Sequence, residues 1–133
     1  MDGDLRNASL HRPLNVRGKK GLSDLLVGRV TDWHDLVQPT DYDNLSFVPA
    51  GKFEHNVPEL LAPGNMKQLV AAWRDEYDLV IIDSAPVGRV VDTMTLAGAV
   101  DGVLLVVGHE GASFGDVRHS LRRLRRPMWW VSA

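Results

Sequence analysis

The hydrophobic pattern of the chain is clearest in two short runs that contain no polar residue. Leu79–Ile82 leads into Asp83, and Val103–Val107 follows a turn at Asp101 and Gly102. A run that is apolar at every position is typical of a strand buried on both faces, as in a parallel sheet covered by helices. We therefore expect two core strands here, over 79–83 and 103–107, and a third strand over 45–49.

Apolar residues recur at helical spacing between these strands. We expect Asn65 to cap a helix that runs to about Tyr77, because its apolar positions form one stripe: Met66, Leu69, Val70, Trp73 and Tyr77. A second helix is expected over about 113–125, with a buried face made of Phe114, Val117, Leu121 and Leu124. Shorter helical pieces are expected over 22–27, 57–61 and 93–99, and residues 1–20 and 29–44 are expected to be mostly loop.

Strands and helices therefore alternate as βαβαβα. This order predicts a parallel sheet with right-handed crossovers, covered by helices on both sides in a three-layer α/β/α arrangement. Three strands are few for such a sheet, and strands this apolar require neighbours on both edges. The sequence therefore resembles part of an α/β domain.

Composition narrows the functional classes. The 133 residues are 44% hydrophobic and 24% charged, as in an ordinary globular protein, and the net charge of -2 gives no electrostatic reason to expect nucleic acid. With no cysteine, there is no disulfide framework or thiolate metal site. No apolar run approaches the roughly 20 residues of a membrane span, and the first residues are not those of a signal peptide.

Carboxylates mark the candidate chemistry. Asp83 ends a buried strand, and ligands of open α/β folds bind at the carboxyl ends of their strands. Asp2 and Asp4 are spaced i and i+2, so in extended chain their side chains point the same way, about 6.5 to 7 Å apart. A metal site is one interpretation. An Asp that simply ends a strand, beside an acidic chain terminus, is the other.

Several blocks, in order, resemble the bacterial tyrosine kinases of capsule and exopolysaccharide assembly, which are related to the MinD and ParA ATPases. The resemblance covers about residues 2–126. The blocks are Asp-Gly-Asp-Leu-Arg at 2–6, Gly-Leu-Ser-Asp-Leu-Leu at 21–26, the strand and Pro-Ala-Gly at 45–51, Asn-Val-Pro-Glu-Leu-Leu at 56–61, 77–86 ("YDxVIIDxPP") and Asp-Gly-Val-Leu-Leu-Val-Val at 101–107.

This resemblance implies a P-loop NTPase fold and a set of site residues. Asp2 matches the catalytic carboxylate that accepts the tyrosine hydroxyl proton. Asp4 and Asp83 match the acidic groups that hold Mg²⁺, largely through water. Arg6 and Ser84 complete the two motifs at the nucleotide. The implied cofactor is Mg²⁺ with ATP, and phosphoryl transfer of this kind depends on positioning and charge neutralisation.

The sequence departs from the family in the phosphate-binding loop. It contains no G-x-x-x-x-G-K-[ST] run, and Gly18-Lys19-Lys20-Gly21 is not one. In the family, the P-loop strand precedes the Asp-x-Asp motif and lies beside the strand that ends at Asp83. We therefore expect a domain lacking the P-loop strand, truncated at both ends, with two apolar strand edges exposed and little ability to bind ATP.

The C-terminus departs as well. We divide the chain into a partial kinase domain over 1–126 and an atypical tail over 127–133. In another reading frame, the codons for Pro-Met-Trp-Trp-Val at 127–131 encode a residue followed by Val-Val-Gly, which is close to the apolar strand expected there. We therefore hypothesise that the tail is translated out of frame.

The function expected from these observations is that of a fragment of a tyrosine autokinase that regulates polysaccharide synthesis and is inactive alone. The implied partners are a membrane polysaccharide co-polymerase that activates the kinase and further kinase subunits, at the cytoplasmic side of the membrane. Two alternatives stay open. One is a fragment of a MinD/ParA-type ATPase, and the other is a non-catalytic module that pairs with an intact kinase.

Overall fold

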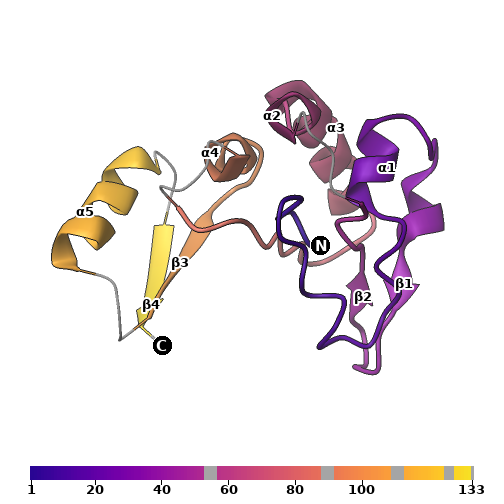
Figure 1. Cartoon of the computed structure of the whole chain (residues 1–133), viewed down its shortest axis with the longest axis horizontal. Helices are drawn as coiled ribbons and strands as arrows, with labels where there is room; N and C mark the ends of the chain where they lie inside the picture. Colours follow the sequence, from indigo (N-terminus) through magenta and orange to yellow (C-terminus); the bar gives the residue numbers. More distant parts are fainter. Residues whose placement is uncertain (53–56, 88–91, 109–112, 125–127, 133) are drawn as a thin grey trace.

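The structure is a computed structural model that describes residues 1–52, 57–87, 92–108, 113–124 and 128–132. Helices and short strands alternate along it (Figure 1). The helices are α1 (Leu22–Leu26), the 3₁₀ helix η1 (Trp33–Leu36), α2 (Val57–Leu60), α3 (Pro63–Arg74), α4 (Asp92–Ala97) and α5 (Phe114–Arg123). The strands are β1 (Gln38–Pro39), β2 (Ser46–Phe47), β3 (Val103–Val107) and β4 (Met128–Ser132). Within the described ranges, no helix is long and apolar enough to cross a membrane.

The named strands form two separate two-stranded sheets. β1 pairs antiparallel with β2, and β3 pairs parallel with β4, with Val103 opposite Met128 and Val107 opposite Ser132. Between these two pairs, residues 1–3 run parallel to residues 81–83 and form a single bridge between Asp2 and Asp83. The strand expected at 79–83 therefore contributes one bridge rather than a ladder, whereas the strand expected at 103–107 is confirmed as β3.

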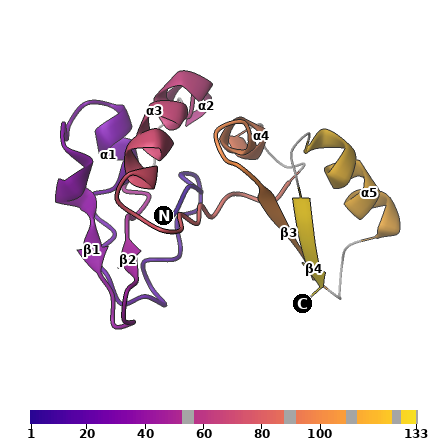
Figure 2. The same ribbon diagram turned by 180° about the vertical axis from the view of Figure 1, so that it is seen from behind.

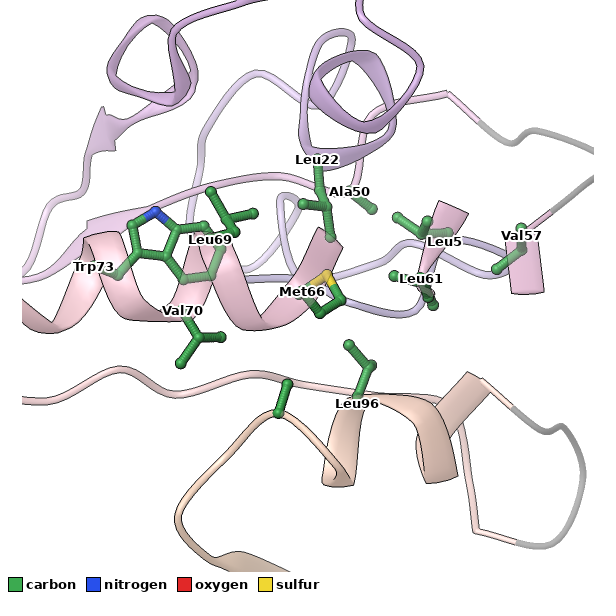
Figure 3. Packing of buried hydrophobic residues seen from close by; sticks show 11 residues of the cluster. Leu5, Leu22, Ala50, Val57, Leu61, Met66, Leu69, Val70, Trp73 and Leu96 are labelled. Carbon is green, nitrogen blue, oxygen red and sulfur yellow. The ribbon is translucent and has the colours of Figure 1, made fainter. Parts of the chain in front are cut away.

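The core is built on one face of α3 (Figure 3). Met66, Leu69, Val70 and Trp73 are buried there, as their helical spacing predicts. They pack with buried residues that come from loops, α1, α2 and α4: Leu5, Leu22, Ala50, Val57, Leu61, Leu96 and Ala99. Helix α4 contributes Leu96, which points toward Met66 across the space between the two helices (Figure 3).

Helix α1 is joined to the loop that follows β2. The amides of Leu22 and Ser23 donate to the carbonyl oxygens of Pro49 and Ala50, at 2.8 and 2.9 Å. Gly51 has a positive φ of 83°, which favours glycine, and a Cβ there would lie 2.4 Å from the Ser23 hydroxyl oxygen. Two sequence blocks that lie far apart in the chain therefore meet in one close contact.

The apolar runs are covered on one face only. Val80 and Ile82 pack against the core, but Leu79 and Ile81 are 75% and 69% exposed, and Leu104 and Val106 of β3 are also exposed. The expectation that these strands are buried on both faces is therefore wrong for this chain. In Figures 1 and 2, β3, β4 and α5 lie on one side of α4 and helices α1 to α3 lie on the other.

Several expected helix boundaries shift. Helix α3 begins at Pro63 instead of being capped by Asn65, whose side-chain amide donates instead to the Leu60 carbonyl at 3.2 Å. It ends at Arg74, before Tyr77. On α5, the expected buried face is wrong for the helix itself, because Val117 and Leu121 are only half-buried and Phe114 is 83% exposed. Leu124, just beyond the helix, is buried.

Other segments were not anticipated or fall outside the description. The expected loop over 29–44 contains η1 and β1, although β1 is short because Pro39 has no amide hydrogen to donate. Residues 128–132, expected to be an atypical tail, form β4 beside β3. The expected domain boundary after Arg126 lies outside the described residues, as does Asn56 at the start of its sequence block.

Candidate functional site

The candidate site lies where three extended segments end side by side. The amide of Asp2 donates to the carbonyl oxygen of Val48 at 3.0 Å, and the amide of Gly3 donates to that of Asp83 at 2.9 Å. The segments ending at Val48, Asp2 and Asp83 are thus neighbours, and the loops after them leave at the same edge. This is the edge at which ligands of open α/β folds bind.

Asp2 is buried, with 1% of its surface exposed. One of its carboxylate oxygens accepts a hydrogen bond from the amide of Asp4 at 3.2 Å. The other accepts from the amides of Ser9 and Leu10, at 3.1 and 3.2 Å. In this arrangement the carboxylate organises the loop after the first segment. Its predicted role as a catalytic base, which requires contact with a substrate hydroxyl, remains a prediction.

Asp4 and Arg6 belong to the loop that Asp2 organises. The Asp4 carboxylate accepts from the amides of Arg6 and Asn7, at 3.2 and 3.0 Å, which closes a tight turn. The Arg6 guanidinium reaches the buried carboxylate of Asp92 at the start of α4, with Nε 2.5 Å and Nη2 3.4 Å from its two oxygens. This forked contact raises the pKa of Arg6 and ties the loop to α4.

Asp83 is the exposed carboxylate of the site. Partial burial raises its pKa above the usual value for aspartate, and the negative charges of Asp2 and Asp4 raise it further. The negative charges of this edge are therefore not fully compensated by the protein. A bound cation would relieve that repulsion.

Ser84 follows Asp83 in the loop. Its hydroxyl donates to the carbonyl oxygen of Ala85 at 3.3 Å, and the hydroxyl of Thr93 donates to the same oxygen at 2.6 Å. Thr93 is the second residue of α4, next to Asp92. The start of α4 therefore holds both loops of the site, one through Asp92 and Arg6 and the other through Thr93 and Ala85.

Gly3 is required for the two carboxylates to be neighbours. A Cβ at this position would lie 2.6 Å from the carbonyl oxygen of Asp83 and 3.1 Å from the side chain of Leu96. Any side chain would separate the first segment from the 81–83 segment. The glycine between Asp2 and Asp4 thus has a steric role, which the residue spacing alone did not indicate.

Magnesium fits this edge in part. Mg²⁺ prefers oxygen ligands, keeps several of its waters and is commonly held by one or two carboxylates, and Asp4 and Asp83 supply that donor type. Over the described ranges, however, no three His, Cys, Asp or Glu side chains gather into a ready-made metal site. The assignment of Asp4 and Asp83 to Mg²⁺ remains a prediction, as does that of Arg6 and Ser84 to the nucleotide.

A nucleoside triphosphate such as ATP fits this edge less well than Mg²⁺ does. The 133 residues contain no G-x-x-x-x-G-K-[ST] loop, so they provide neither its cradle of amides nor its lysine for the β- and γ-phosphates. Arg6, a positive side chain beside the carboxylates, is already engaged by Asp92.

Sequence reasoning brought together Asp2, Asp4 and Asp83 and missed the residues that support them. Asp92 directly precedes the helical piece expected over 93–99, but its pairing with Arg6 joins positions far apart in the chain, and nothing local in the sequence indicates it. Nothing local in the sequence indicates the contact between the Thr93 hydroxyl and the Ala85 carbonyl oxygen either.

Comparison with known proteins identifies what the chain is similar to, although no family model matches it. The protein described as "Putative tyrosine-protein kinase EpsB", of Ralstonia solanacearum, is 36% identical over 125 residues, which are 94% of this chain and 16% of EpsB. The tyrosine-protein kinase CpsD of Streptococcus agalactiae serotype III is 35% identical over 107 residues, which are 80% of this chain and 46% of CpsD. The chain thus spans a sixth to a half of the length of these relatives.

Solved structures agree with the sequence relatives. The kinase domain of the Escherichia coli tyrosine kinase ETK superposes with a TM-score of 0.92 and 28% identity, over 98% of this chain and 52% of that one. The VpsO kinase domain gives 0.89 and 28% identity, over 98% of this chain and 66% of that one. The expected resemblance to bacterial tyrosine kinases and the expected fold class are therefore both confirmed: the chain is a homologue of part of their kinase domain.

Proposed function

Bacterial tyrosine kinase domains are homologues of this chain. We therefore propose that the 133 residues of the chain form the acidic, magnesium-facing part of such a domain. The observation that carries the proposal is the parallel pairing of Asp2 with Asp83, which brings the carboxylates of two distant sequence blocks to one edge. Charge neutralisation at such an edge is what phosphoryl transfer requires of a protein.

The residues divide this task between them. Asp83 and Asp4 would hold Mg²⁺ through their oxygens and through water, and the ion when bound would supply neutralisation of phosphate charge. Asp2 holds the loop that carries Asp4, through the amides of Asp4, Ser9 and Leu10. Asp92 and Thr93 fix the positions of the two loops.

The 133 residues do not complete a kinase. Without a phosphate-binding loop, the chain alone is expected to bind ATP weakly and to transfer no phosphate. The activity of its relatives, their tyrosine substrates and the use of Mg-ATP are therefore proposed for the chain only in the setting of a full kinase domain.

The same resemblance supports a proposal for the biological setting. We place the chain in a tyrosine autokinase of capsule or exopolysaccharide synthesis, acting at the cytoplasmic face of the membrane. Its partners would be a membrane-bound polysaccharide co-polymerase and further copies of the kinase. A MinD/ParA-type ATPase is the less favoured class, because the relatives reported above are tyrosine kinases.

A chimera tests the proposal. Residues 2–107 of this chain would replace the matching segment of CpsD, and autophosphorylation on tyrosine would be measured with Mg-ATP. The chimera is expected to be active, and Asp83→Asn in it is expected to lower activity by about tenfold or more. Asp43→Asn, at an exposed position in the loop between β1 and β2, is the matched control and should leave activity unchanged. An active chimera that tolerates Asp83→Asn would refute the proposal.

A second candidate function is favoured by one observation. The exposed apolar side chains of Leu79, Ile81, Leu104 and Val106 form the kind of surface that pairs with another protein. The chain would then act without catalysis, as a module that binds an intact kinase. Co-elution with a purified homologous kinase domain, lost on Ile81→Lys, would support this candidate.

A further inference from the structure

His34 joins two parts of the chain that lie far apart in the sequence. It is the second residue of η1, and its ring reaches Glu76, which follows the last turn of α3. Its Nδ1 lies 2.6 Å from a carboxylate oxygen of Asp32, and its Nε2 lies 2.9 and 3.1 Å from the two oxygens of Glu76. The imidazole is therefore held between two carboxylates, one from its own segment and one from another.

The protonation state of His34 follows from this geometry. A protonated ring donates from both nitrogens, whereas a neutral ring donates from one and carries a lone pair on the other. At these distances a lone pair would be repelled by the carboxylate oxygen that it faced. The arrangement with both contacts is therefore that of the protonated ring. The same contacts raise the pKa of His34 above its usual value, with Asp32 the larger cause.

The two contacts of the ring differ in what supports them. Asp32 caps η1, and the oxygen that contacts Nδ1 also accepts from the backbone amide of His34 at 2.9 Å. The contact with Glu76 joins residues 42 positions apart and is made by side chains alone. When the ring is neutral, its remaining proton is therefore expected to stay on Nδ1, and the contact with Glu76 is expected to be lost.

Aromatic contacts place η1 against α3 beside this pair of carboxylates. The ring of His34 stacks on that of Trp33, with 3.7 Å between the centroids. Trp33 in turn meets the ring of Trp73 edge-on at 6.2 Å and lies 6.3 Å from the ring of Tyr77. The position of Trp33 therefore reports whether η1 lies against α3.

We propose that His34 is a proton-operated latch that holds residues 32–37 against the end of α3. With the ring protonated, the latch is closed and Trp33 is fixed between His34 and Trp73. With the ring neutral, the contact with Glu76 opens, and the segment is free to move away from α3. The proposal depends neither on kinase activity nor on Mg²⁺.

The direction of the pH response follows from linkage. The charged groups that act on His34 are Asp32 at the start of η1 and Glu76 beyond α3, and both raise its pKa. Closure is therefore complete below the pKa of the free ring and is lost as pH rises through the raised value. Histidine titrates near neutral pH, so the latch is expected to open there. All three side chains are about half exposed, so added salt should weaken closure.

An NMR titration of the full chain from about pH 5.5 to about pH 8.5 tests the proposal. The ring signals of His34 give its pKa, and the nuclear Overhauser effects between the rings of Trp33 and Trp73 report closure. These effects are expected to fall by about half or more, with the same midpoint as the His34 ring. Titration of His34 with unchanged contact between Trp33 and Trp73 would overturn the proposal.

Glu76→Gln separates a latch from a passive ion pair. The amide of glutamine can donate to the lone pair of a neutral ring, so this variant is expected to stay closed over the whole pH range. Asp78→Asn, which removes an exposed carboxylate two residues further along, is the matched control and should open like the parent. Equal opening of the Glu76→Gln variant and the parent at high pH would also overturn the proposal.

Discussion

Asp2 and Asp83 are partners across a parallel β-bridge, although they come from opposite ends of the first two thirds of the chain. The bridge places a buried carboxylate beside an exposed one. Because the two negative charges repel, the pKa of Asp83 is raised by Asp2 as well as by partial burial. This pair, with Asp4, concentrates negative charge at the edge from which the site loops leave.

Asp83→Asn should stabilise the chain near neutral pH in the absence of divalent metal. A carboxylate with a raised folded pKa is disfavoured in its charged form, so its cost appears as pH rises from the unfolded pKa through the folded one. The melting temperature of Asp83→Asn should therefore exceed that of the parent at pH 7, and the two should converge near pH 3. Millimolar Mg²⁺ should raise the melting temperature of the parent and leave the variant unchanged. An equal response of the variant to Mg²⁺ would place the ion elsewhere.

Gly3→Ala should destabilise the fold by about 1 to 3 kcal/mol, the usual cost of forcing a group into a packed space. The new methyl group would meet the Asp83 carbonyl oxygen and push the two segments apart. Gly64→Ala in the first turn of α3 is the matched control, because a Cβ there meets no atom within 4 Å. Urea unfolding of both variants makes the comparison. Equal stability of the two would show that the segments are not held this closely.

Asp92→Asn should lower the melting temperature more than Asp101→Asn does. Asp92 is buried and receives the forked guanidinium of Arg6, whereas the ion pair of Asp101 with Arg74 is exposed to solvent and screened. Arg6→Lys should recover only part of the contact, since lysine cannot donate in a fork. Thermal unfolding at low and high salt checks both statements, and the Asp101 variant should show little change at high salt.

His34 should make stability depend on pH. Its ring nitrogens lie 2.6 Å from an Asp32 oxygen and 2.9 Å from a Glu76 oxygen, and these contacts raise its pKa above 6.5, with Asp32 the larger cause. A raised histidine pKa adds stability that is fully present below the unfolded pKa and is lost as pH rises through the folded pKa. The melting temperature should therefore fall between about pH 6 and pH 8 in the parent and much less in His34→Gln. Added salt should reduce the difference, because all three side chains are exposed.

The 133-residue chain alone should form no phosphotyrosine when incubated with Mg-ATP. The physical reason is the missing phosphate-binding loop in its sequence. Phosphotyrosine detection by mass spectrometry, with Asp2→Asn as the background control, is the measurement. ATP-dependent labelling of the parent above that background would show that the carboxylate edge can act without such a loop.

The hydrophobic pattern of the sequence predicted helices and strands that depend on neighbouring residues in the chain. The apolar stripe of α3 followed from spacing alone, because it buries one continuous face against the core. The β3 run was also predictable as a strand, and it pairs with β4 along its edge. The exposed faces of Leu79 and Ile81 did not follow, since an apolar run states what a strand can bury but not whether a covering element is present. The antiparallel pair of β1 with β2 was missed because Gln38 and Pro39 carry no strand signal.

In the candidate site, the sequence likewise predicted the carboxylates but not the contacts that hold them in place. The carboxylates were predictable because Asp83 ends an apolar run and because the Asp-x-Asp block resembles a known motif. The burial of Asp2 under loop amides was not, since it depends on how residues 4–10 fold back over it. The pairing of Arg6 with Asp92 depends on the position of α4, which only the assembled core determines.

The apolar side chains left open on Leu79, Ile81, Leu104 and Val106 also bear on the fate of the chain in a cell. Such surfaces are what chaperones and proteases recognise, and strand edges of this kind favour aggregation. Produced without a covering partner, the chain is expected to be held by chaperones, degraded or deposited in inclusion bodies. Its steady-state abundance would then report whether a partner is present, so a pulse-chase measurement of its half-life, with and without a co-expressed kinase domain, would serve as an assay for assembly in vivo.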